Sequence, residues 1–574
     1  MNFKNNNKNE NTKRHTQRAL VLQGGGTLGA YEAGVLKVLC KKLGNNDRKC
    51  DIGKEGDLLF HVVAGSSIGA MNGAIFVSQF LNTLSWEKAS EKLVEFWRNQ
   101  LSVKNIDISD VSGNWYNQWI KRNPTAATEE AARRYYSVKK LLLNQVRNNM
   151  YYQCAEIEDN KFFDKSNILS KWFLHSNKPL QDSIEKYATF PIATEFFDKN
   201  NIPKQYQQYP QPRLLVFSVD VAEGEIVTFD SYPKSDGSRR TEYGNKLENV
   251  IEYNDGISID QVMASGTVPE IYDYAPIKIQ STSFEQRNQD DRCKTDIKDK
   301  KNTRYFWDGG WLSNTPFREL LQAHQEYWDG VGKIDKIPDL EVYIINIHPR
   351  KIDIDILPVD YDGVKDRQHD IIYSDRNSHY DENTFHLLTD YNNFVNQMND
   401  LVNVAISKVN DEKDKKELQE KLKSIFQTET MYKDGKEESR KYERLLESGF
   451  KLSKVVRIER SNYINNISGK TGDLTFETID KLIKEGECDA WLSLIQDDIK
   501  NMKIDNLINN DTCNKLLNRL NKTTDCLRNS DYEDTNSQTY HNLTCLSDEI
   551  KECNIESHNA SMILQSIEEL KEIL

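Results

Sequence analysis

Two apolar segments near the start of the chain each run into a glycine-rich turn and then into a stretch with helical spacing. Residues 18–23 (RALVLQ) lead into GGGTLG and AYEAGVLKVLCKKL, and residues 58–65 (LLFHVVAG) lead into SSIGAMNGAIFVSQFL. Strand, turn and helix, twice in succession, predict a parallel sheet with helices packed on its faces. Both turns then lie at the carboxyl edge of that sheet, where such folds keep their sites.

Further apolar runs extend this pattern toward the middle of the chain. The expected strands are 213–220, 225–230, 339–349 and one that ends in RYFWDGG. Helical spacing predicts helices over 257–266 and 315–328. The segment 83–211 is rich in helical spacing, loops and aromatic residues, and we interpret it as an insertion that caps the site.

The chain, at 574 residues, is too long for one ordinary domain, so a catalytic domain with an appendage is expected. Residues 1–17 are polar and basic and are predicted to be disordered. Residues 18–375 form the predicted catalytic domain, which includes the 83–211 insertion. Beyond about residue 380, strand-like runs give way to charged helical periodicity, so 380–574 is predicted to be a helical C-terminal region.

The composition argues against several classes of partner and site. A formal net charge of −13 argues against nucleic acid as a partner and against general electrostatic docking on anionic lipid. It leaves open a peripheral contact with a membrane through apolar side chains. The nine cysteines include no CxxC pair, which fits neither a disulfide framework nor a zinc site. Reduced thiols and a cytoplasmic location are therefore expected.

Neither a secretory signal nor a membrane span is expected. The N-terminal stretch MNFKNNNKNENTKRHTQR lacks the apolar core of a signal peptide. A membrane span needs about 18 or more consecutive apolar residues. The nearest candidate, residues 61–76, is interrupted by Ser66, Ser67 and Asn72.

The second turn carries the pattern GxSxG, from Gly65 to Gly69, with Ser67 at its centre. A serine on a sharp turn between a strand and a helix is exposed, and glycines two positions away relieve the crowding around it. The nearby helix N-terminus also favours a developing negative charge. Ser67 is therefore a candidate nucleophile. The alternative is a serine that only caps the helix at a glycine-tolerant turn.

The first turn, residues 24–29 (GGGTLG), has two interpretations. Consecutive glycines let backbone N–H groups point at one anion, so Gly24, Gly25 and Gly26 can supply the oxyanion hole of an acyl transfer. The same six residues match GxGxxG, a dinucleotide-binding fingerprint that wants an acidic residue at the end of the second strand. Here that strand runs into glycine and serine, and the nearest aspartates precede it. Acyl transfer is therefore the preferred interpretation.

A serine hydroxyl needs a base, and two aspartates that end apolar strands are candidates. Asp308 precedes a glycine turn, and Asp220 ends the run RLLVFSVD. A histidine relay is a third arrangement, because the chain order Ser67, Asp308, His348 matches that of α/β-hydrolase triads. The residues by themselves leave these alternatives open.

Four stretches together resemble the patatin-like phospholipase family. They are QGGGTLGAYEAGVLKVL, GSSIGAMNGAIF, VMASGTVPEIYDYAPIKI and WDGGWLSNTP, in the family's order within residues 18–316. They resemble, in turn, its oxyanion segment, its GxSxG elbow, the segment before its DG[GA] motif, and that motif itself. The motif glycines in the match are Gly29, Gly65, Gly69, Gly309 and Gly310.

The resemblance implies a three-layer α/β/α sandwich with a mostly parallel central sheet, and a Ser–Asp dyad without histidine. Ser67 would be the nucleophile and Asp308 the base, which favours Asp308 over Asp220 and makes His348 a strand-end residue. The glycine loop would form the oxyanion hole. The family hydrolyses acyl esters of phospholipids, neutral lipids or lysolipids, so a lipid ester is the implied substrate. This chemistry needs no metal, and no cofactor is expected.

Two features depart from the family pattern. Gln23 stands where many members have Asp or a hydrophobic residue, and little consequence is expected from it. A charged insert, residues 281–303, precedes the DGG segment and is expected to reshape the mouth of the site.

The sequence is compatible with three classes of function. The first is a lipid acyl hydrolase, with a Ser67–Asp308–His348 triad esterase as its variant. The second is a nucleotide-binding oxidoreductase that uses GxGxxG. The third is a catalytically silent scaffold whose C-terminal helices recruit partners.

Overall fold

The computed structural model describes residues 16–49, 58–102, 153–154, 175–196, 211–241, 250–269, 271–278, 303–331, 337–351, 357, 361–434, 436–442, 446, 449–460, 470–528, 536–553 and 558–574. The N-terminal segment 1–17 lies outside these residues except for its last two positions. Most of the 83–211 insertion lies outside them, as does all but the last residue of the charged insert 281–303.

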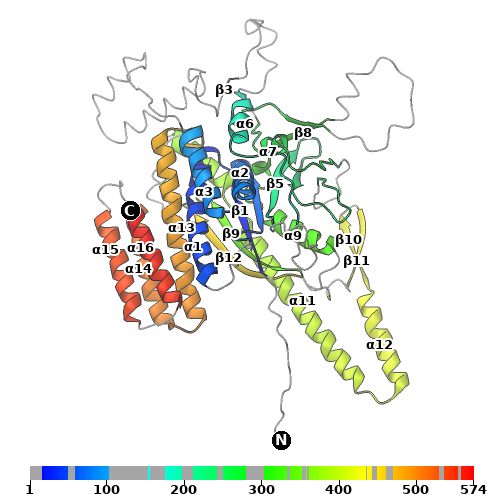
Figure 1. The fold of residues 1–574 in the computed structure, drawn as a ribbon. Helices are drawn as coiled ribbons and strands as arrows, with labels where there is room; N and C mark the ends of the chain where they lie inside the picture. The colour runs from blue at the N-terminus through cyan, green and yellow to red at the C-terminus, as the bar shows by residue number, and fades with distance from the viewer. Residues whose placement is uncertain are drawn as a thin grey trace, which may run out of the picture. The chain divides into compact units, whose positions relative to one another are not determined.

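A mixed sheet forms the centre of the fold, with the strand order β12-β9-β1-β2-β5-β8-β7 and with β6 paired to β5 (Figure 1). The strands are β1 (Thr16–Leu22), β2 (Val62–Ser66), β5 (Arg213–Asp220), β6 (Glu225–Asp230), β7 (Ala275–Lys278), β8 (Thr303–Asp308), β9 (Asp339–Asn346) and β12 (Leu452–Glu459). β1, β2 and β5 are parallel. β6 and β8 run antiparallel to β5, and β7 runs antiparallel to β8.

The register of these strands brings three loops together at one edge. Leu22 of β1 is opposite Gly65 of β2, so the segments that follow these two parallel strands begin side by side. The last residue of β2 is opposite Phe217 of β5. The next residue of β5, Ser218, is opposite Asp308 in the antiparallel β8. The turn after β2 and the end of β8 therefore meet across β5.

Helices alternate with these strands along the chain. They are α1 (Gly29–Lys49), α2 (Ile68–Thr83), α3 (Trp86–Glu95), α6 (Lys178–Glu185), α7 (Ile259–Ser265), α9 (Phe317–Val331) and α10 (Tyr361–Tyr373). α2 packs on β2 and β5, and α7 packs on β5, β7 and β8. The predicted fold class, an α/β/α fold with a C-terminal helical extension, is confirmed. Within the described part of the chain, none of the helices combines the length and the apolar composition that crossing a bilayer requires.

The C-terminal residues form four helices. They are α13 (Phe476–Ile504), α14 (Asn510–Arg528), α15 (Asn536–Glu552) and α16 (His558–Ile573), each packed against the next, with α16 also against α13. α13 also packs along α1 (Figure 1). Where these two helices approach, a Cβ on Gly486 would lie 2.1 Å from the carbonyl oxygen of Tyr31, and one on Gly34 would lie 2.0 Å from that of Ile483. The Tyr31 hydroxyl donates to Asp489 at 3.0 Å. The four helices thus share a core with the sheet.

The chain divides into two compact units. One consists of residues 18–320, 343–375 and 456–574, and the other consists mainly of 321–342 and 376–455. The second unit contains the helices α11 (Ser378–Ser407) and α12 (Glu412–Phe426) and the antiparallel hairpin of β10 (Glu429–Asp434) and β11 (Lys436–Lys441).

The expectation that strands end before residue 380 is wrong, because β10, β11 and β12 follow it. β12 (LSKVVRIE) mixes charged and apolar residues, as a strand at the edge of a sheet does, and only part of it is buried. Because of this mixed composition, the sequence of β12 resembles that of the charged helices before and after it, so the strand was not predicted.

Candidate active site

Ser67 occupies a strained turn between β2 and α2. Its φ of 55° and ψ of −127° lie outside the regions that non-glycine residues usually adopt, which costs on the order of 1–3 kcal/mol. The N–H of Ser67 donates to the Ser265 hydroxyl at 2.9 Å, and that hydroxyl donates to the carbonyl of Phe217. Gly65 leaves room for the turn, because a Cβ there would lie 2.3 Å from the carbonyl oxygen of Gly69. These contacts hold the Ser67 side chain at the carboxyl edge of the sheet.

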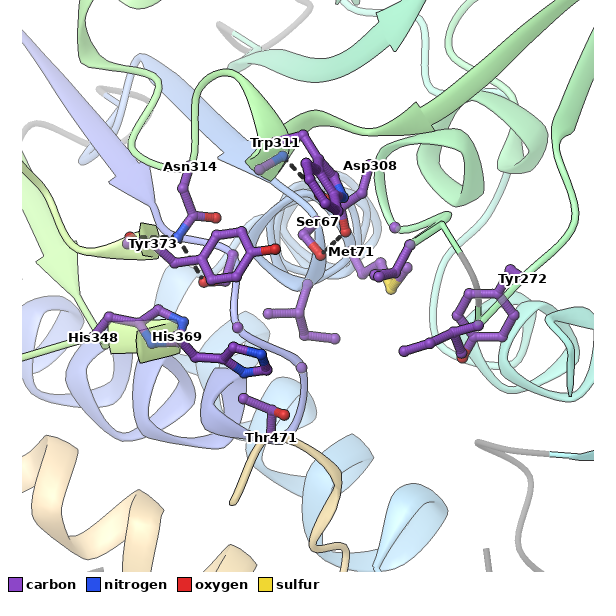
Figure 2. Close-up of a pocket in the computed structure, with 18 of the residues that line it drawn as sticks. Ser67, Met71, Tyr272, Asp308, Trp311, Asn314, His348, His369, Tyr373 and Thr471 are labelled. Atoms are coloured by element: carbon purple, nitrogen blue, oxygen red, sulfur yellow. Dashed lines mark hydrogen bonds between the residues drawn. The ribbon is translucent and has the colours of Figure 1, made fainter. Parts of the chain in front are cut away.

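Asp308 approaches the Ser67 hydroxyl from the end of β8. Ser67 Oγ donates a hydrogen bond of 2.5 Å to Asp308 Oδ2, and the N–H of Gly310 donates one of 2.7 Å to Oδ1 (Figure 2). Burial raises the pKa of Asp308 from its ordinary 3.8 to about 7, while the two hydrogen bonds oppose the rise. A carboxyl with a pKa near neutrality, bonded directly to a serine hydroxyl, can accept its proton and return it.

The glycine loop runs directly beside the serine. A Cβ on Gly24 would fall 2.7 Å from the Cβ of Ser67, so no side chain fits between them. The N–H of Gly24 donates to the carbonyl of Asn314 at 3.3 Å, whereas the N–H groups of Gly25 and Gly26 have no acceptor among the described residues. Of the three glycines expected to supply oxyanion donors, Gly25 and Gly26 have an N–H group that is not already used within the described residues. The other motif glycines lie in β2 (Gly65), at the start of α2 (Gly69), at the start of α1 (Gly29) and in the 3₁₀ turn after β8 (Gly309, Gly310).

Gln23, for which little consequence was expected, braces this loop. It is completely buried, and its Nε2 donates to Thr315 Oγ1 at 2.8 Å and to the carbonyl of Tyr373 at 3.0 Å. Its Oε1 accepts from the backbone N–H groups of Ile347 and His348. One amide side chain thus joins the glycine loop to the turn after β8, the end of β9 and the end of α10. An aspartate or a hydrophobic residue cannot make all four bonds.

The loop is held from two further directions. Asn314 Nδ2 donates to the carbonyl of Gly24 at 3.0 Å and to that of Tyr373 at 2.7 Å. Thr27 Oγ1 donates to the carbonyl of Thr471 at 2.9 Å. Thr471 lies just before α13, so residues of the C-terminal region help to fix the glycine loop.

The two alternative bases make their contacts elsewhere. Asp220 Oδ2 accepts from the Arg304 guanidinium at 2.8 and 2.5 Å. His348 lines the same cavity as the serine, but its Nδ1 lies 3.2 Å from Asp370 Oδ1, and Asp308 bonds the serine without an intervening imidazole. A linear Ser–His–Asp relay is therefore not the arrangement in this structure.

The described residues around Ser67 and Asp308 line a cavity of about 150 Å³, similar in size to a protein cavity that holds one benzene ring. Its two sides differ, as Figure 2 shows. Met71 and Tyr272 lie on one side of Ser67, and Val268 and Ile271 belong to the same turn as Tyr272. The other side carries Asn314, Tyr373, His348, His369 and Thr471. One side is thus mainly apolar and the other polar.

Among the residues of this site that were not singled out from the sequence are Ser265, His369, Tyr373 and Thr471. Ser265 lies within the stretch VMASG, so its motif was a usable signal. His369 and Tyr373 lie in KDRQHDIIYSDR, which matches no catalytic pattern. Thr471 contributes a backbone carbonyl, and no side-chain signal marks such a contact.

A comparison with protein-family models matches residues 20–321, more than half of the chain, to the family described as patatin-like phospholipase. Among solved structures, a crystal structure of VipD from Legionella pneumophila matches with 12% sequence identity and a TM-score of 0.24, over 97% of this chain and 88% of that chain. A TM-score that low supports no argument about fold or function. The sequence matches no curated protein.

Proposed function

Because this chain belongs to the patatin-like phospholipase family of lipid acyl hydrolases, we propose that it cleaves carboxylic esters of lipids through an acyl-enzyme on Ser67. The hydrogen bond of 2.5 Å from Ser67 Oγ to Asp308 Oδ2 carries the proposal. A serine paired with a buried carboxyl can act as an activated nucleophile. The apolar side of the cavity suits the acyl chain of a lipid ester.

In the first half of the reaction, Asp308 takes the proton of Ser67 as Oγ bonds to the ester carbonyl carbon. The carbonyl oxygen becomes an oxyanion. When the tetrahedral intermediate collapses, the bond to the alcohol breaks and Asp308 gives its proton to that leaving oxygen. Water then attacks the acyl-enzyme with Asp308 again as the base, which releases the fatty acid and restores Ser67.

The oxyanion is stabilised by the glycine loop. Gly25 and Gly26 are the proposed donors, because their N–H groups have no acceptor among the described residues while that of Gly24 has one. Losing one such donor typically costs about 3 kcal/mol of transition-state stabilisation. The hydrogen bonds of Gln23, Asn314 and Thr27 keep the loop in one conformation, so no reorganisation is needed during the reaction.

We also propose a peripheral contact with a lipid surface near the cavity. Trp311, which lines the cavity, and Leu312 are 55% and 54% exposed in the turn that follows Asp308. Exposed large apolar side chains beside a site can insert into the boundary of a lipid aggregate. The net charge of −13 favours a zwitterionic surface over an anionic one.

The alternative functions fit these contacts less well. The dinucleotide interpretation lacks an acidic residue at the end of β2, and the glycine loop lies directly against Ser67. A catalytically silent scaffold does not account for the strained backbone of Ser67, because residues with such strain cluster at active sites and ligand-binding sites.

A fluorophosphonate probe and a lipid panel test the proposal. The probe should label the wild type and not Ser67→Ala. Asp308→Asn should lower kcat about 10²- to 10⁴-fold, the usual range for loss of a general base. Product analysis with phospholipids, lysolipids, triacylglycerols and p-nitrophenyl esters then identifies the substrate.

Ser66→Ala is the matched control. The Ser66 hydroxyl is buried next to the nucleophile and has no hydrogen-bond partner among the described residues, so its loss should leave labelling intact. Labelling that survives Ser67→Ala, or turnover that survives both Ser67→Ala and Asp308→Asn, would refute the proposal.

A further inference from the structure

The polar side of the cavity carries two histidines on neighbouring elements. His348 follows β9, and His369 lies on α10 four residues before Tyr373. Both rings pack near Tyr373, with ring centroids 5.9 Å (His348, tilted) and 6.0 Å (His369, edge-on) from that of the tyrosine. Figure 2 shows both on the side of Ser67 that faces away from Met71 and Tyr272. This side of the cavity is therefore built differently from the side suited to an acyl chain.

A carboxylate orients the inner histidine. His348 Nδ1 lies 3.2 Å from Asp370 Oδ1, and both residues are buried. When Nδ1–H donates to Asp370, the other ring nitrogen is directed away from that carboxylate, as in the pairs that orient ligand-binding histidines. Nε2 then lies beside the glycine loop, 2.8 Å from where a Cβ on Gly25 would be.

His348 and His369 are the basic side chains among the described residues that line this cavity, since none of the others is Lys or Arg. The two imidazoles lie on the same side as the Thr471 segment and the glycine loop. Imidazole N–H groups and backbone N–H donors together suit an anion with several acceptor oxygens. An uncharged alcohol has fewer acceptor oxygens and would leave most of these N–H donors without a partner.

We propose that His348 and His369 form a subsite for a phosphate group in the alcohol half of the ester, so that the enzyme prefers acyl esters of phosphate-bearing alcohols to uncharged glycerides. The inference rests on the function proposed above, because it assumes that Ser67 attacks a lipid ester. With the acyl chain against Met71, the leaving alcohol extends across Ser67 toward the histidines. The two histidines would then be specificity-determining residues, and Ser67 and Asp308 would keep their roles in the chemistry.

Two substrates that differ only in the phosphate test this subsite. They are a lysophosphatidic acid and a monoacylglycerol with the same acyl chain, and kcat/KM is measured for each below its aggregation concentration. In the wild type the ratio of the two values should favour the phosphate ester. His369→Gln should lower that ratio at least about tenfold, because a charge-assisted contact to phosphate is lost and the uncharged ester does not make it. His348→Gln and Asp370→Asn should lower the ratio in the same direction.

His386→Gln is the matched control, since it makes the same substitution at a half-exposed histidine on α11 that does not line the cavity. Its ratio should equal that of the wild type. Inorganic phosphate distinguishes the source of the anion. Competitive inhibition that His369→Gln relieves supports a subsite that binds phosphate by itself. An altered ester ratio without such inhibition supports recognition of phosphate only as part of the lipid.

An unchanged ratio in both histidine variants would overturn the inference. So would an equal loss on both esters, because that result assigns the histidines a structural role. Failure of the proposed function is a different result, in which the wild type hydrolyses neither ester or Ser67→Ala hydrolyses both.

Discussion

Among single residues, Asp308 decides how the site responds to pH. Its carboxyl must be ionised to accept the Ser67 proton, and burial raises its pKa to about 7. We therefore expect kcat/KM to rise about tenfold per pH unit below 7 and to level off above it. A pH profile on a soluble ester measures this directly. A profile that is flat from pH 5 to 8 would contradict the assignment of Asp308 as the base.

The same pKa shift affects stability, and Asp308→Asn serves as the control. Between about pH 4 and 7 the folded state holds the Asp308 proton that the unfolded state has lost, so the free energy of unfolding should fall as pH rises. Asp308→Asn should remove this contribution, on the order of 2 kcal/mol, from the difference between pH 5 and pH 8. Buried Glu32, whose pKa is raised to about 8, adds a slope of the same sign in both proteins. Urea denaturation at the two pH values separates the two contributions.

Ser265 shows how a residue outside the chemistry can set its geometry. Its hydroxyl accepts from the N–H of Ser67, so Ser265→Ala should loosen the strained turn and lower kcat roughly tenfold or more, with little change in KM. Ser218→Ala is the control, because its buried hydroxyl has no hydrogen-bond partner among the described residues. Steady-state kinetics of both variants would check this, and equal kcat values would argue against a positioning role for Ser265.

At the level of helices and strands, local patterns predict most of the sheet and fail where burial comes from distant segments. β1 and β2 were predicted within two to four residues at their starts, because apolar runs before glycine turns are a strong local signal. β12 was missed, because its charges resemble those of the helices around it. Ser67 and Asp308 could be named from motifs. The structural role of Gln23 could not be predicted from the sequence, because its four hydrogen-bond partners come from three distant parts of the chain.

The contact between α1 and α13 gives a prediction at this scale. A Cβ on Gly486 would lie 2.1 Å from the Tyr31 carbonyl oxygen, so Gly486→Ala should force the helices apart and cost about 1–3 kcal/mol. Gly44→Ala, on α1, is the control, because nothing lies within 4 Å of its added Cβ. That change should stabilise the helix by up to about 1 kcal/mol. Thermal or urea denaturation would measure both, and equal effects would contradict the close packing.

For the molecule as a whole, the proposed lipid contact depends on how an exposed turn borders the cavity. Trp311→Ser combined with Leu312→Ser should reduce binding to zwitterionic vesicles severalfold, because it removes apolar area that would otherwise leave water. Ile504→Ser is the control, since Ile504 is 72% exposed at the end of α13 and does not line the cavity. Vesicle flotation would compare them, and an equal loss in the control would remove the case for this surface.

The sequence predicted the C-terminal helices but not the part of the fold against which they pack. Their apolar faces predicted helices, but not the surface that those faces cover. α13 lies along α1, the helix that follows the glycine loop, and the segment before it reaches Thr27. Contacts between segments so far apart leave no local pattern in either one.

The bond between Thr27 and Thr471 joins positions 444 residues apart. A ribosome that adds about 5–20 residues per second needs roughly 20–90 seconds to cover that interval. Once Ser67 has been added, the growing polypeptide carries this serine for most of that time but lacks the Thr471 carbonyl that anchors the glycine loop. A fragment released before residue 471 is synthesised would therefore lack one of the contacts that fix the loop beside Ser67.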